Sequence, residues 1–215
     1  MGFGFKRWWG LQLVVVLWGA MAMAGTGDSG LPKITVLVNN SAGVSRKVLR
    51  KAEVDAGLIF RAAGVEIEWE DCSSDLAVDV CRQAPVSNQL VFVLHIVPTG
   101  KTSTDSVFGV AFLGEGGIGK YCDVFFDRVE EAERGAGTDA SHLLGAVAAH
   151  ELGHLLLGSN SHSHVGIMTP VWQEQSLRAI DMGTFLFTHE QAWFIRARLG
   201  RESLVVSSAA TKAVE

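Results

Sequence analysis

The fold of this chain follows from the stretch Ala146–Met168, which reads AVAAHELGHLLLGSNSHSHVGIM. In this stretch His150 and His154 stand four residues apart, and Glu151 follows His150 directly. Residues four apart lie one above the other on a helix, so the two imidazoles face the same metal ion. Glu151, one step round the helix, reaches a water at that metal and is the candidate general base. Flanking apolar residues recur at helical spacing, and Gly158 predicts the end of the helix.

Two histidines do not complete a catalytic zinc site, because catalytic zinc generally takes three protein ligands and keeps one position open. The loop that follows the helix offers His162 and His164, and it also contains Asn160. Asn160 is the weakest of these candidates because an amide oxygen is a poor zinc ligand. A downstream carboxylate, Glu174 or Glu190, is a further alternative, although the histidine loop lies closer along the chain.

This block resembles the metzincin clan of zinc endopeptidases, whose pattern HExxHxxGxxH is followed by a Met-turn. The spacing here is longer than in that pattern. The family pattern would place its glycine at Leu157 and its third histidine at Asn160, whereas this chain has Gly158 and His162. One residue is therefore added before the glycine and one after it.

The end of the block carries the second part of the resemblance. His162-Ser163, followed by Gly166-Ile167-Met168, is similar to the ending of matrix metalloproteases. The resemblance implies that His162 is the third ligand, with His164 as the rival position. It also implies that Met168 is the Met-turn residue beneath the metal. Trp172 would then line the specificity pocket that follows the turn, or else simply pack against its neighbours.

The resemblance implies a function as well as a site. The expected cofactor is Zn²⁺, the expected substrate is a peptide or protein, and the expected activity is zinc-dependent endopeptidase hydrolysis with Glu151 as general base. Two alternatives remain open from the sequence: a secreted zinc-binding protein of the same fold with little turnover, and a zinc hydrolase of small molecules. Some metzincins have a tyrosine helper after the Met-turn, but the one tyrosine here, Tyr121, lies far upstream.

The first residues predict export. Lys6 and Arg7 precede an apolar run at 11–18, and Ala22-Met23-Ala24 is a typical cleavage site, so residues 1–24 read as a signal peptide. We therefore expect a secreted or periplasmic protein with no stable membrane span after cleavage, since the run is short for one. An uncleaved N-terminal anchor is the alternative.

Charge and cysteines restrict the class further. Without Lys6 and Arg7 the chain has 16 basic and 23 acidic residues, a net charge of −7, which argues against a nucleic-acid partner. Export permits disulfides. Of the three cysteines, Cys72 and Cys81 flank one polar loop and are the favoured pair, whereas Cys122 in an apolar alternation predicts a buried thiol.

Periodicity along the chain predicts an α/β (α+β) fold. Alternating or continuous apolar runs predict strands at 34–38, 65–70, 90–97, 107–113 and 121–126. Helical spacing predicts helices at 44–63, at about 139–158 with Asp139 or Ser141 as cap, and at 188–199 after a capping box at Thr188. This order is similar to the metzincin N-terminal half, with 107–113 as the candidate strand beside the cleft.

The domain organisation is simple. After a short lead at 25–32, residues 33–200 form a single zincin-like catalytic domain with a mixed twisted sheet, an active-site helix and a C-terminal helix, and 201–215 is expected to be a flexible tail. Two other histidines are left out of the site. His95 is expected to pack inside a central strand. His142 lies about 12 Å along the helix from His150, too far to share its metal.

Overall fold

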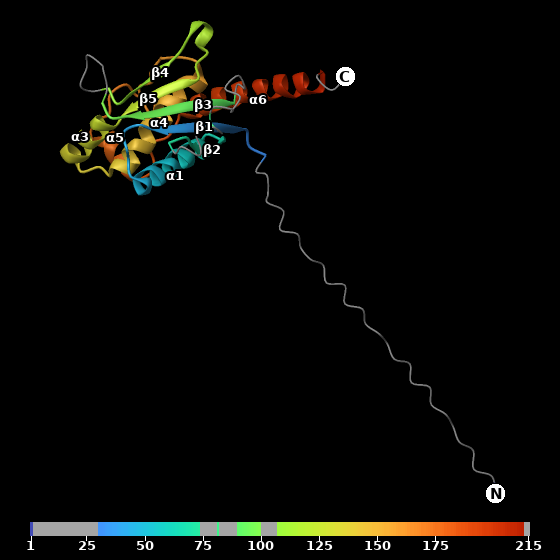
Figure 1. Ribbon diagram of the computed structural model, residues 1–215, viewed down its shortest axis with the longest axis horizontal. Coiled ribbons are helices and arrows are strands. Elements are labelled where there is room, and N and C mark those ends of the chain that lie inside the picture. Colours follow the sequence, from blue (N-terminus) through green and yellow to red (C-terminus); the bar gives the residue numbers. More distant parts are fainter. Residues whose placement is uncertain (2–29, 74–80, 82–89, 100–106, 213–215) are drawn as a thin grey trace.

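The computed structural model describes Met1 and residues 30–73, 81, 90–99 and 107–212, although not the side chains of 202–212. Nearly all of the expected signal peptide at 1–24, and most of the lead at 25–32, therefore lie outside the described residues (Figure 1). None of the helices in the described part combines the length and the hydropathy that a membrane span requires.

A mixed five-stranded sheet forms the centre of the molecule (Figure 1). Its order is β2-β1-β3-β5-β4, with β4 antiparallel to β5 and the other neighbours parallel. The strands are β1 (Lys33–Asn40), β2 (Glu66–Asp71), β3 (Val91–Val97), β4 (Gly109–Phe112) and β5 (Tyr121–Phe125). The predicted fold class is confirmed, and β4 forms one edge of this sheet.

Two helices bury the apolar side of the sheet. The helix α1 (Arg46–Ala62) contacts β2, and α4 (Ala140–Leu157) contacts β3, β4 and β5. The two helices also pack against each other at Gly145, where an added Cβ would lie 2.6 Å from the carbonyl oxygen of Ala52. Only a residue without a side chain permits this approach. Because α4 is enclosed on all sides, it is apolar almost all round, as expected for a buried helix.

Two helices were not predicted: α3 (Phe126–Ala136) and α5 (Glu174–Asp181). Both are short and highly charged, and each buries a single residue, Val129 and Ile180 respectively. So small an apolar stripe gives little periodic signal. Between β4 and β5 the chain forms one turn of 3-10 helix, η1 (Glu115–Gly117).

The C-terminal helix α6 (His189–Lys212) begins as predicted and runs further than predicted. The capping box is formed: the Thr188 N–H donates to Gln191 Oε1 (2.9 Å), and the Gln191 N–H donates to Thr188 Oγ1 (3.2 Å). Gly200 follows the expected end at Leu199. A single glycine costs a helix only about 1 kcal/mol, however, and the backbone continues through most of the expected tail.

The cysteines behave as expected. Cys72 and Cys81 form a disulfide with a Cα–Cα distance of 5.9 Å, and Cys122 is a buried free thiol. The expectation for His95 was wrong, because its side chain is 41% exposed. The strand register places it beside Asp123 of β5, with Nδ1 3.5 Å from Asp123 Oδ1. Its neighbours Phe92, Leu94 and Ile96 fill the core, so β3 is fully buried on one face only.

Candidate metal centre

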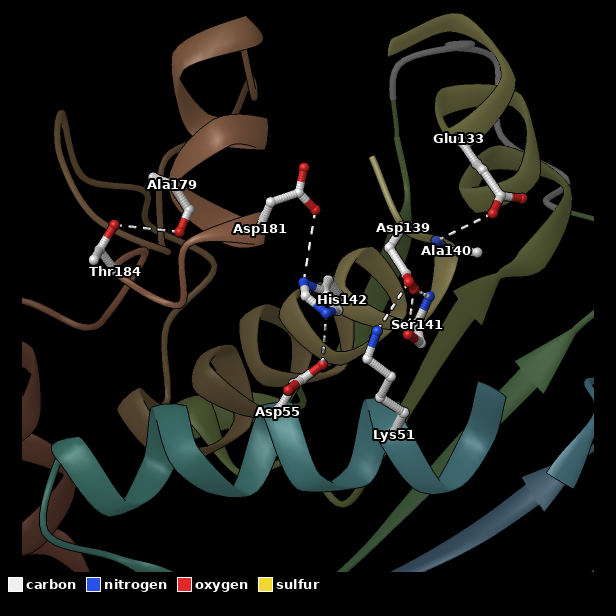
Figure 2. A network of polar contacts seen from close by, with 10 residues as sticks. All are labelled: Lys51, Asp55, Glu133, Asp139, Ala140, Ser141, His142, Ala179, Asp181 and Thr184. Carbon is white, nitrogen blue, oxygen red and sulfur yellow. Dashed lines mark hydrogen bonds and ion pairs between the residues drawn. The ribbon is translucent and has the colours of Figure 1, made fainter. Parts of the chain in front are cut away.

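The helix α4 is the rigid platform of the candidate site. At its start Asp139 Oδ1 accepts a hydrogen bond from the Ser141 N–H (2.8 Å), which makes Asp139 the N-cap (Figure 2). At its end Gly158 adopts a left-handed conformation (φ 66°), and its N–H donates to the carbonyl of His154 (2.9 Å). Both ends were predicted. Between them His150, Glu151 and His154 are each at most 8% exposed.

The two helical histidines are oriented by backbone carbonyls. His150 Nδ1 lies 2.7 Å from the carbonyl oxygen of Ile167, and His154 Nδ1 lies 2.8 Å from that of Ser159. A carbonyl only accepts, so both Nδ1 atoms carry the proton and both Nε2 atoms carry a lone pair. These lone pairs face each other, with the two Nε2 atoms 3.1 Å apart.

That spacing fits a metal better than a hydrogen bond. Two acceptor nitrogens at this distance repel unless a positive centre lies between them. Zinc–nitrogen bonds of about 2.0–2.1 Å at tetrahedral angles would separate such nitrogens by roughly 3.3 Å. The geometry of this pair therefore suits zinc, with the carbonyls playing the orienting part that outer partners play in metal sites.

The loop after α4 brings in a third imidazole. The ring centroid of His162 lies 5.4 Å from that of His150 and 4.9 Å from that of His154. One ligand atom from each of the three histidines lies within 4.8 Å of the others, so they form a group that can hold a metal ion. His162 is the exposed member of the group.

The other histidine and carboxylate candidates lie outside this group. His164 lines a separate hollow with Ser163 and Thr169, whereas Asn160 lines the same cleft as the three histidines. Glu174 pairs with Arg178 on α5, and Glu190 is exposed on α6.

Burial keeps the three imidazoles neutral. Burial, together with charge repulsion from the neighbouring His154 and His162 and partly opposed by the hydrogen bond to Ile167, lowers the pKa of His150 to about 4. Burial likewise lowers the pKa of His154 and of His162. A neutral imidazole offers the lone pair that a metal needs, so the chain presents its ligands in the binding form.

Glu151 lies in the same cleft and packs against β4. A Cβ added to Gly109 would lie 2.8 Å from Glu151 Cγ and 2.9 Å from Glu151 Oε1. Gly109 thus leaves the room that the carboxylate occupies. Burial raises the pKa of Glu151 to about 8, since a carboxylate here loses much of its hydration. A cation held by the neighbouring imidazoles would instead lower the pKa of Glu151.

Met168 packs directly against the middle of α4. It is completely buried, and a Cβ added to Gly153 would lie 2.7 Å from its sulfur atom. The Ser163 N–H donates to the Met168 carbonyl (2.9 Å), which closes the loop that carries His162. The turn therefore touches the helix at Gly153, fixes the loop at Ser163 and, through the Ile167 carbonyl, orients His150.

The three histidines and Glu151 line a cleft of about 230 Å³, together with β4 residues Gly109–Ala111. Trp172 forms part of its wall: its ring stacks on Phe108 (5.6 Å between centroids) and meets the edge of His150 (5.7 Å). Its Nε1–H donates to the carbonyl of Thr169 (3.1 Å). Phe108 and Gly109 were not singled out from the sequence. Both lie more than thirty residues before the start of α4, so no local spacing connects them to it.

Comparison with known proteins shows a similarity to a solved structure. No family model matches the chain, and the search of curated proteins likewise finds no match. Among solved structures, the chain is similar to the crystal structure of archaemetzincin from Methanopyrus kandleri. The TM-score is 0.51 at 13% identity, over 79% of this chain and 97% of the archaemetzincin chain. At this identity the similarity concerns the fold.

Proposed function

We propose that the protein is a secreted zinc-dependent endopeptidase in which His150, His154 and His162 hold the metal. The observation that carries the proposal is the convergence of three neutral imidazoles beside a buried glutamate, in a cleft along an edge strand. The archaemetzincin-like fold is consistent with it. Export rests on the signal-peptide pattern at residues 1–24.

Zinc is the metal that this ligand set favours. Three imidazoles without a carboxylate or a thiolate suit zinc rather than magnesium or calcium, which take oxygen ligands. When bound, zinc supplies Lewis-acid chemistry that polarises a carbonyl group and makes water more acidic.

Glu151 would carry the proton in the reaction. Its carboxylate would accept a proton from the attacking water and then deliver it to the nitrogen of the leaving amine. Packing of its side chain against Gly109 restricts the carboxylate to the cleft. Glu151 is also buried, which leaves its side chain little freedom to move away from the ligands.

The edge strand β4 would position the substrate. It pairs with β5 on one side only in the described sheet, and residues 109–111 line the cleft. An extended peptide would add to this edge through backbone hydrogen bonds, which requires no particular side chain. Apolar residues surround the cleft, with Trp172 and Phe108 beside the ligands.

The test uses the mature chain that begins at Gly25, as wild type and as Glu151→Gln. Zinc content is measured by mass spectrometry, and cleavage is measured on a mixed peptide library. We expect about one zinc per chain in both proteins, with cleavage products from the wild type alone. Zinc binding without cleavage by the wild type would overturn the peptidase proposal and favour the alternative of a metal-binding protein. Absence of zinc binding would overturn both.

A further inference from the structure

A second cavity, of about 310 Å³, lies along the N-terminal half of α4. It is bounded by α1, α4 and the segment that follows α5. Most of its wall is apolar and includes Ile59, Ala146, Ile180 and Phe185. The volume is at the small end of the range of about 300–1,000 Å³ that is usual for ligand pockets.

One end of this cavity is charged. There His142 of α4 lies between two carboxylates that come from two other helices (Figure 2). Its Nε2 is 3.9 Å from Asp55 Oδ2 on α1, and its Nδ1 is 3.6 Å from Asp181 Oδ1 at the end of α5. Each ring nitrogen faces a different carboxylate, so the three side chains do not converge on one point as metal ligands do.

The two carboxylates share one imidazole, so even a doubly protonated His142 ring would balance the charge of only one of them. The cation one turn away on α1, Lys51, donates instead to Asp139 Oδ2 (2.8 Å) (Figure 2). Asp55 Oδ2 is buried and accepts no hydrogen bond from the described residues. Burial accordingly raises the pKa of Asp55, although the charges of His142 and Lys51 oppose that shift.

Asp181 adds to this negative end. It is the last residue of α5, where the helix dipole disfavours an acidic side chain and favours a cation. The mouth of the cavity is apolar: Leu58 is 58% exposed and Met182 is 69% exposed. The cavity thus combines apolar walls with an unneutralised acidic end, which is complementary to a long apolar stem that carries a positive group.

We propose that this cavity binds an arginine side chain of a peptide or protein partner. The guanidinium would lie in the cavity beside the His142 ring, where its planar set of donors can reach Asp55 and Asp181, which both line the cavity. The methylene stem would lie along Ile59 and Ile180, and the partner's flanking apolar residues would cover Leu58 and Met182. This binding involves neither the three histidines nor Glu151, so it holds whether or not the metal centre cleaves peptides.

The test measures peptide binding to the full mature chain with the Glu151→Gln substitution, so that no probe is cleaved. The probe is acetyl-Leu-Arg-Leu-amide, and the matched control peptide has citrulline in place of arginine, which has nearly the same shape without the charge. Binding is followed by amide chemical shifts in NMR titrations. We expect saturable shifts around His142 and Asp181, with at least about tenfold weaker binding of the citrulline peptide. Equal binding of both peptides, or shifts only around His150, would overturn the proposal.

Variants distinguish the loss of a carboxylate contact from a general effect on folding. Asp181→Asn should weaken binding of the arginine peptide about tenfold. Glu174→Gln, at an exposed carboxylate of the same helix, should leave the affinity for this peptide unchanged. Met182→Lys at the exposed mouth should also weaken peptide binding. The new ammonium group would compete for the same carboxylates without disturbing the core. Unfolding midpoints are measured for each variant. Unchanged affinity in both Asp181→Asn and Met182→Lys would overturn the proposal.

Discussion

The helix α4 and the loop that follows it each contribute imidazole rings to the candidate metal centre, but they hold these rings differently. His150 and His154 are buried, and each ring is fixed through Nδ1 by a backbone carbonyl. His162 is exposed, and no residue in the described part of the chain hydrogen-bonds its ring. Two ligands are therefore already oriented before a metal binds, and the third is held by the course of its loop between Ser159 and Ser163.

The helical ligands should show the largest effect. His150→Ala or His154→Ala removes an oriented ligand and leaves a hollow in the floor of the cleft. We expect zinc affinity to fall by at least about a thousandfold and peptide cleavage to disappear. Competition with a chelator measures the affinity, and circular dichroism checks that the variants fold. Retention of wild-type affinity by either variant would show that α4 is not the platform of the site.

The loop ligand should show a smaller loss. Because the ring of His162 is less constrained, we expect His162→Ala to weaken zinc binding on the order of a hundredfold, with His150 and His154 still able to hold the ion. His164→Ala is the matched control two residues away and should bind zinc like the wild type. The same chelator competition measures both variants. The reverse pattern would transfer the third ligand to His164.

Contact between the loop and the helix can be tested at Gly153. Gly153→Ala would force a methyl group against the Met168 sulfur and the Phe187 ring, since an added Cβ lies 2.7 and 2.8 Å from them. We expect the variant to lose about 1–3 kcal/mol in the free energy of unfolding, as overpacked cores do. Urea unfolding measures this loss. Gly200→Ala is the control, because nothing lies within 4 Å of a Cβ at Gly200.

The smallest effect is expected at the start of the helix. Hydrogen bonds from Lys51, and then from Ser141, hold the pKa of the Asp139 carboxyl well below its usual range. Asp139→Ala should cost about 1 kcal/mol of stability at neutral pH, the usual contribution of an N-cap. A lowered pKa in the folded state means that this contribution is present above about pH 4 and is lost as the pH falls below it. Urea unfolding at pH 7 and pH 3 checks whether the difference between the two proteins shrinks.

Local patterns predicted the sheet from the apolar runs of its strands, and they predicted α4 from the spacing of His150 and His154 and from the signals at its two ends. The ends of α4 were predictable because Asp139 and Gly158 act within one turn. Contacts between distant segments were not predictable. The room that Gly109 leaves for Glu151, and the stacking of Phe108 on Trp172, depend on how the sheet and helices pack together. His95 was misjudged because a continuous apolar run does not show that one face of a strand is less covered than the other.

The contact between the Ser159 carbonyl and the His154 ring limits where related chains can differ in length. The carbonyl fixes the course of the backbone one residue after the Gly158 cap, because it binds the ring of His154. The bond from Ser163 to Met168 fixes the course again on the far side of His162. Insertions and deletions are therefore best accommodated in the short span 160–162, between two points that cannot shift. A sequence pattern with a constant helix, a constant Gly-Ile-Met turn and a variable interval between them would recognise relatives that a rigid motif overlooks.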